Sequence, residues 1–135
     1  MGAFSEYIKN KILDHVFSCG SGLKVYTPPQ MIYVALSKTD PLVIGLTEPP
    51  TGDGYSRVAT DSSFWDDASD GFVRNSAQIV FGPATKYWGV ISHFAILDSA
   101  SGGNILFAGG ISEGKFVEEG DMLVFNKYNL RFRLV

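Results

Sequence analysis

The sequence predicts a mainly β protein, an antiparallel β-sandwich of jelly-roll type with one N-terminal amphipathic helix. Three observations predict it. The chain of 135 residues holds 15 Gly and 6 Pro, a content that favours many turns and therefore many short strands. Aromatic residues make up 13% of the chain and suit side chains that pack between sheets. Roughly eight apolar or alternating segments are separated by turn residues, as in a sandwich.

Length and composition indicate one domain that spans residues 1–135. We expect its helix at about residues 5–17 and its sandwich at about residues 25–135. Cys19 is the one cysteine, so no internal disulfide is expected and packing must hold the fold. The formal net charge is −3 and no basic stripe is visible, which argues against nucleic acid as a partner.

The N-terminal segment lacks the pattern of a signal peptide. Its charged side chains, Glu6, Lys9, Lys11 and Asp14, interrupt any apolar run. No apolar stretch approaches the length of a membrane span, and no cofactor motif is present. The sequence therefore predicts a soluble chain that is made in a cytoplasm, with no cofactor and no membrane contact.

An apolar stripe at helical spacing predicts the single helix. Its members are Phe4, Ile8, Ile12, Leu13, Val16 and Phe17. Ser5 is a suitable N-cap, and the run from Cys19 to Gly22 is expected to end the helix. A helix of about 13 residues is marginal in isolation. We therefore expect it to dock, either on its own sheet or on a neighbouring subunit.

The strands follow in order along the chain, with the strongest pattern at residues 87–111, where two apolar strands flank the polar turn Ser99–Asn104. The expected strands are Met31–Ser37, Tyr55–Ala59, Ala77–Phe81, Trp88–Leu97, Asn104–Ala108, Phe116–Val117, Met122–Phe125 and Leu130–Val135. Two long polar loops, at about residues 39–56 and 61–71, interrupt them. Loops of this length in a compact domain usually carry function or contact a partner.

No residue pattern predicts a catalytic site. His15 and Cys19 lie four residues apart at a helix end, where the helix dipole disfavours a thiolate, so a structural role is favoured over a nucleophilic pair. His93 lies in mid-strand and is predicted to be a buried, hydrogen-bonded side chain. Asp53 and Asp66 are only formal candidates for the carboxylate pair of a glycan hydrolase.

Two loop features suggest weak binding sites. Four carboxylates, Asp61, Asp66, Asp67 and Asp70, crowd one loop, but their spacing does not fit a calcium loop and we predict no metal. Gly52-Asp53-Gly54 lacks the third glycine and the helix of a phosphate cradle. Trp65 and Tyr55, if exposed, could stack on a sugar; a place in the core is the alternative.

Five segments resemble a family of small tailed-bacteriophage virion proteins, whose members are tail-fibre-like or head-decoration-like. They are FSEYIKNKILDHVF, TPPQMIYVALSKTDP, LTEPPTGDGYSRV, NSAQIVFGPAT and YWGVISHFAILDSASGGNILFAGGI. The resemblance runs in order from about residue 3 to the C-terminus. Its most distinctive marks are the W-G-x-x-x-H-F run from Trp88 to Phe94, and the turn that joins Asp98 to Gly102-Gly103-Asn104.

The resemblance implies a non-enzymatic virion structural protein. A capsid decoration or cement protein is our first interpretation, and a tail-tip or tail-fibre-associated module is the alternative; a host-glycan-binding β-sandwich module is a further one. The implied partners are other virion proteins, either the major capsid protein or tail proteins. A homo-oligomer, for example a trimer, is expected in the virion.

The predicted partner contacts lie on the helix face and in the first long loop, because each is apolar or long beyond local need. The residues are Phe4, Ile8, Ile12, Val16, Leu46 and Tyr55.

Overall fold

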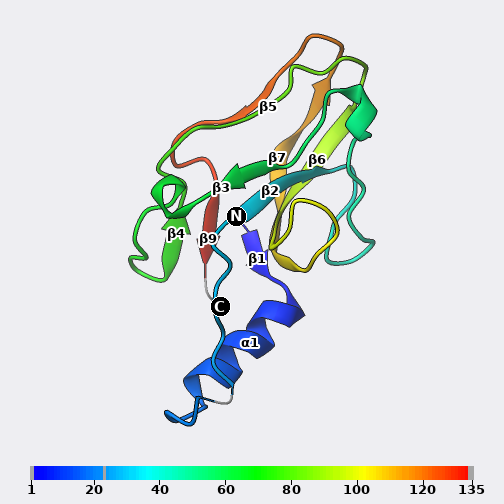
Figure 1. Ribbon diagram of the computed structural model, residues 1–135. Helices are drawn as coiled ribbons and strands as arrows, with labels where there is room; N and C mark the ends of the chain where they lie inside the picture. Colours follow the sequence, from blue (N-terminus) through cyan, green and yellow to red (C-terminus); the bar gives the residue numbers. More distant parts are fainter. Residues whose placement is uncertain (1, 23, 134–135) are drawn as a thin grey trace.

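The computed structural model describes residues 2–22 and 24–133. Over this part of the chain the protein is mainly β, with one α-helix and two sheets that pack face to face (Figure 1). The predicted fold class is confirmed. The strands divide unequally between the layers, because seven belong to one sheet and two to the other among the described residues.

The large sheet has the strand order β3-β2-β6-β7-β1-β9-β4, and the small sheet pairs β5 with β8. All pairings are antiparallel except that of β1 with β9. The bounds are β1 Gly2–Phe4, α1 Glu6–Val16, β2 Ile32–Ser37, β3 Val58–Thr60, β4 Phe72–Arg74, β5 Ile79–Phe81, β6 Gly89–Leu97, β7 Ile105–Val117, β8 Leu123–Phe125 and β9 Arg131–Arg133. Short 3-10 turns lie at η1 Thr51–Asp53 and η2 Ser62–Phe64.

The core fills the space between the sheets and is rich in aromatic rings. The Phe94 ring lies 6.0 Å from that of Phe125 in the small sheet and 5.7 Å from that of Phe132 in β9. Trp88 is fully buried, and its indole Nε1 donates a hydrogen bond of 2.8 Å to the carbonyl of Asp53. This bond ties the first long loop to the core, which explains the tryptophan of the W-G-x-x-x-H-F run.

β7 is one strand where the sequence predicted two. It pairs with β6 at both ends, but the register shifts between Ile91 and His93, so that residues 111–114 bulge away from the ladder. Gly114 permits this path, because a Cβ there would lie 2.9 Å from a methyl of Val90. The bulge therefore lies between the two segments that the sequence predicted as separate strands.

The helix begins where Ser5 caps it, as predicted. The Ser5 hydroxyl accepts from the backbone N–H of Ile8 and donates to the carbonyl of Ile105, so the cap also ties the helix to β7. The helix ends at Val16, with Phe17 as its C-cap, just before the run at Cys19–Gly22. Figure 1 shows α1 extending from one end of the sandwich, with the chain from residue 24 returning beside it.

Two short strands were not predicted. β1 and β4 have three residues each, too few for alternation to be visible in the sequence. β1 fits between β7 and β9, and β4 closes the far edge beside β9. Residues 134–135, which the sequence places in the last strand, lie outside the described residues.

Candidate interaction surfaces

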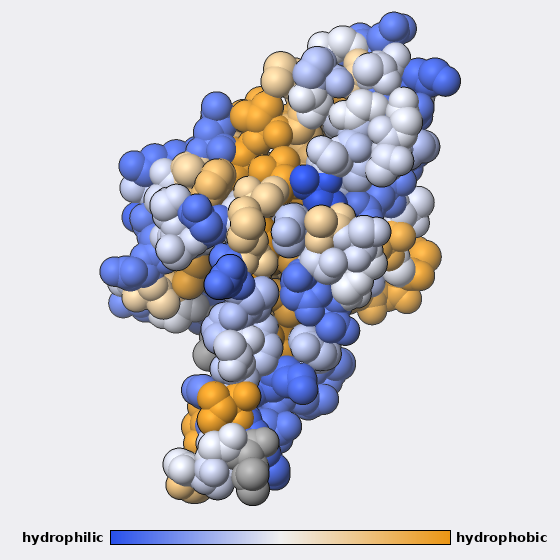
Figure 2. All heavy atoms as spheres, in the orientation of Figure 1, coloured by the Kyte–Doolittle hydropathy of each residue, from blue (hydrophilic) through white to orange (hydrophobic). Residues whose placement is uncertain are grey.

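A projecting arm exposes apolar side chains. We define the arm as α1 with residues 17–22 and 24–31 that follow it. Its first half packs on the sandwich, because Ile8 is 4% exposed and Ile12 contacts the core. Farther along the arm Tyr26 is partly buried, but four apolar side chains are exposed. Their exposed fractions are Leu13 55%, Val16 63%, Phe17 72% and Val25 51%. Figure 2 shows orange, apolar spheres near the tip of the arm.

Hydrogen bonds hold the arm together. The backbone N–H of Tyr26 donates to His15 Nδ1 at 3.0 Å, and the Ser18 hydroxyl donates to the His15 carbonyl at 2.9 Å. His15 therefore fastens the returning segment to the helix, which is a structural role. Burial raises the pKa of the Tyr26 phenol, and Tyr7 and Asp98 add to this electrostatically. Cys19 is exposed and its thiol is free.

The predicted contact residues separate into two groups. Val16 is exposed on the arm, whereas Phe4, Ile12 and Leu46 are partly buried against the protein itself. Ile8 and Tyr55, which were also named as partner contacts, are buried in this structure, at 4% and 3% exposed. Ile8 is on the side of the helix that docks on the chain's own body. Tyr55 turns into the core, where its ring lies 5.6 Å from that of Trp88.

The first long loop is held by a polar network around Tyr55. The Tyr55 hydroxyl donates to Glu48 Oε2 at 2.6 Å and accepts from the Leu36 N–H at 3.1 Å. Arg57 Nη2 lies 2.7 Å from Glu48 Oε1, and Arg57 Nη1 donates to the carbonyls of Ser99 and Gly102 at 2.8 Å. The bond to Glu48 raises the pKa of Arg57, and burial acts against it. The length of this loop thus has a structural explanation.

The loop tip is a second exposed apolar group. Leu42, Val43 and Ile44 are 41%, 80% and 73% exposed. Asp40 fixes the turn, because its carbonyl accepts from the N–H groups of residues 43–45 and its carboxylate accepts from that of Leu42 at 3.0 Å. The tip is therefore held in one shape while its side chains face solvent. The sequence offered a signal in three consecutive aliphatic residues, but the prediction fell on Leu46, which packs inward.

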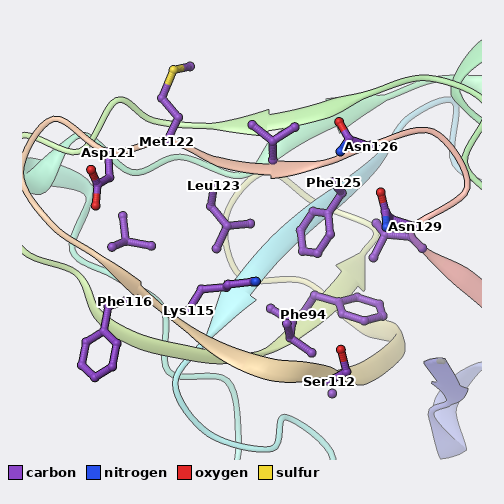
Figure 3. Close-up of a pocket in the computed structure, with 15 residues that line it drawn as sticks. Phe94, Ser112, Lys115, Phe116, Asp121, Met122, Leu123, Phe125, Asn126 and Asn129 are labelled. Carbon is purple, nitrogen blue, oxygen red and sulfur yellow. The ribbon is translucent and has the colours of Figure 1, made fainter.

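A cleft of about 660 Å³ opens between the bulge of β7 and the strand β8 (Figure 3). Apolar and polar side chains both line it, and Figure 3 shows Leu123 and Phe125 pointing from β8 toward β7. Lys115 extends between the two strands, Asn126 and Asn129 lie at one end, and Phe116 points away. Such a cleft suits a ligand with both apolar and polar parts. Sequence analysis missed it because the lining comes from three separate segments.

The aromatic pair predicted for sugar stacking is not formed. Tyr55 is in the core, whereas Trp65 is partly exposed and lines a separate apolar pocket of about 290 Å³. The Trp65 indole donates to Thr60 Oγ1 at 3.0 Å, and its ring lies 5.8 Å from that of Phe132. Stacking of a sugar on Trp65 stays a prediction.

The acidic loop does not gather its carboxylates. Asp61 accepts from the N–H and hydroxyl of Ser63, and these bonds lower its pKa. Asp66 forms an ion pair with Arg74 at 3.2 Å. No cluster of three or more potential metal ligands is present in residues 2–22 and 24–133, a range that includes Asp67 and Asp70.

His93 has two polar neighbours in the structure. Its Nδ1 lies 2.8 Å from the Ser92 hydroxyl, and its Nε2 lies 3.9 Å from Asp40 Oδ2. The imidazole is 25% exposed, so it is half-buried at the sheet surface beside the loop tip. Asp53 and Asp66 lie on different elements, in η1 and in the loop before β4.

The turn that marks the sequence is held by one carboxylate. Asp98 accepts from the Asn104 N–H at 2.7 Å and from its side-chain amide at 3.0 Å. Gly103 has a φ of +79°, and a Cβ there would lie 2.5 Å from Asp98 Oδ1. The glycine and the two polar residues therefore form one structural unit.

Comparison with known proteins places these features in a family. A family model described as podophage GP4 fiber I protein gp80 matches residues 3–133. The search of curated proteins returned no match. Within the described part of the chain, no helix is long and apolar enough to cross a membrane.

Proposed function

The chain belongs to the family of the podophage GP4 fiber I protein gp80 and is a structural protein of a phage virion; on that premise we propose that it is a non-enzymatic component of a tail fibre, attached to other virion proteins through its arm. The match favours the fibre-associated alternative over the capsid-decoration interpretation that the sequence alone put first. It covers nearly the whole chain, so the fibre assignment applies to the sandwich and the arm together.

The observation that supports attachment through the arm is the exposure of its second half. Leu13, Val16 and Phe17 recur at i, i+3 and i+4, the spacing of a helix face that packs against another surface. The protein's own body buries Ile8 and covers Ile12 in part, but leaves these three side chains exposed. Exposed apolar groups of this kind mark contacts with other proteins. The proposal includes self-association through the same face, for which a trimer is one arrangement.

A matched pair of variants tests the attachment. Phe17 and Tyr87 are 72% and 53% exposed, so Phe17→Asp and Tyr87→Asp each replace an exposed aromatic side chain, the first on the arm and the second outside it. Each variant is supplied to a phage that lacks the wild-type gene, and the protein is quantified in purified particles. We expect Phe17→Asp to reduce incorporation at least about tenfold, equivalent to about 1.4 kcal/mol of contact energy, and Tyr87→Asp to leave it unchanged.

Gold-labelled antibody against the protein tests its place in the virion. Label confined to the tail is the expected result. Label spread over the head would overturn the fibre assignment and restore capsid decoration. Equal incorporation of the two folded variants would instead show that the arm is not the attachment surface.

A further inference from the structure

The edge of the large sheet carries a basic face on β4 and β9. The register places Arg74 opposite Arg131 and Phe72 opposite Arg133. Because strand side chains alternate, Phe132 points into the core at 5% exposure while its two neighbours point to solvent. We call Phe72, Arg74, Arg131 and Arg133 the arginine face.

Aromatic rings orient the guanidinium groups of this face. The Arg131 and Arg133 Cζ atoms lie 5.1 and 5.3 Å from the centre of the Phe72 ring. Arg74 lies 3.8 Å from the ring of Tyr128, which Lys127 also approaches at 4.9 Å. A stacked guanidinium keeps its N–H edge free to donate two parallel bonds to a carboxylate.

The arginine face has fewer carboxylate partners within the chain than it has guanidinium groups. Arg74 has the carboxylate of Asp66 at 3.2 Å. Among the residues that the structure describes, no carboxylate lies within ion-pair distance of Arg131 or Arg133, although Asp67 and Asp70 are on the neighbouring hairpin. Like charges opposite each other in a sheet cost stability. An anionic partner would relieve that repulsion.

The chain itself holds a complementary surface at its other end. We define the acidic end as residues 113–121, which contain four carboxylates, Glu113, Glu118, Glu119 and Asp121, and one cation, Lys115. The segment's charge of −3 equals the net charge of the whole chain. The Asp121 carboxylate accepts from the Glu118 N–H at 3.0 Å and shapes the turn. The side chains of Glu118 and Glu119 are exposed. Figure 1 shows this turn at the opposite end of the sandwich from β4 and β9.

We propose that the arginine face of one copy binds the acidic end of a second copy, so that neighbouring subunits contact each other head to tail. Such a contact joins two different surfaces, and its repetition builds a row or closes a ring. The contact is separate from attachment through the arm. A nucleic acid or a sugar is less suited, because two guanidinium groups already cover the Phe72 ring on which a base or sugar would stack.

Charge exchange between two variants tests the contact. One protein carries Arg131→Glu and Arg133→Glu, and the other carries Glu118→Lys and Glu119→Lys. Both also carry Phe17→Asp, so that association through the arm does not contribute. Sedimentation velocity is measured for each alone, for their equimolar mixture and for the Phe17→Asp chain with native charges, at about 0.05 M and 0.5 M salt.

We expect the chain with native charges to associate at low salt, and its association constant to fall at least about tenfold at high salt, where screening is strong. Each charge variant alone is expected to stay monomeric, and their mixture is expected to associate again, because the variants exchange the signs of the two surfaces. Should Arg131→Glu with Arg133→Glu fail to fold, the Glu118→Lys, Glu119→Lys protein alone still tests the acidic end.

Two results would overturn the proposal. One is a chain with native charges that stays monomeric at every concentration at low salt. The other is association that both charge variants retain. Binding of duplex DNA or of an acidic polysaccharide to the arginine face, with no association between copies, would likewise assign the face to another partner.

Discussion

Arg57 and Glu48 form an ion pair at 2.7 Å in which the arginine side chain is only 8% exposed, and this pair joins the middle and the end of the first long loop to the 99–104 turn. The turn carries one of the sequence marks of the resemblance. The pair shows that the two segments, 42 residues apart, form one structural unit.

Removal of this arginine tests the unit. We expect Arg57→Met to lower the free energy of unfolding by about 3 kcal/mol, because Glu48 and two carbonyls would lose their buried partner. Arg74→Met is the matched control, since Arg74 and Asp66 are 49% and 33% exposed and their pair should contribute less than about 1 kcal/mol. Urea denaturation measures both. Equal losses would mean that the Arg57 pair is no stronger than a surface pair.

Helix docking gives a second prediction. Ile8→Asp should lower the free energy of unfolding by more than about 3 kcal/mol, because it places a charge in the core. Leu13→Asp, at a residue that is 55% exposed, should change it by less than about 1 kcal/mol. Thermal denaturation followed by circular dichroism compares them. A stable Ile8→Asp protein would show that the helix does not pack on its own sandwich.

Alanine substitutions at two adjacent glycines distinguish steric crowding by a Cβ from backbone strain. Gly102 and Gly103 have φ of +62° and +79°, but a Cβ at Gly102 meets nothing within 4 Å. Gly102→Ala should therefore cost about 1 kcal/mol from conformation alone. Gly103→Ala should cost more, about 2–3 kcal/mol, because the methyl would displace Asp98 or Ser99. Unfolding free energies that are equal for the two variants would rule out the crowding.

Tyr55 predicts how stability changes at alkaline pH. Burial, with the bond to Glu48, raises the pKa of its phenol well above the ordinary 10.0. The folded protein thus holds this proton more tightly than the unfolded chain. Its contribution is complete below pH 10 and is lost as the pH rises further. Tyr55→Phe should flatten that decline, whereas Tyr87→Phe, at an exposed tyrosine, should not. An unchanged slope in Tyr55→Phe would contradict the assignment.

The local patterns of the sequence predicted most elements correctly. Ser5 and the four-residue apolar spacing placed the helix, and the alternation about Phe132 placed the last strand with Arg131 and Arg133 outward. These features depend on neighbours within a few residues, which a sequence displays directly. The apolar runs at residues 32–37 and 89–97 likewise became the central strands β2 and β6.

The surfaces depended on contacts between distant segments, and there the sequence was a weaker guide. The identity of an aromatic residue such as Tyr55 does not show whether its side chain is buried or exposed. Its burial depends on strands that are distant in the sequence and adjacent in the fold. The same holds for Ile8, which the bond between Ser5 and Ile105, 100 residues apart, fixes against the body. The sequence by itself determined the helix with its N-cap and the longer strands, because these depend on neighbouring residues. Only the tertiary structure decided which apolar side chains remain exposed and which arginines face each other, because strand pairing and register set those positions.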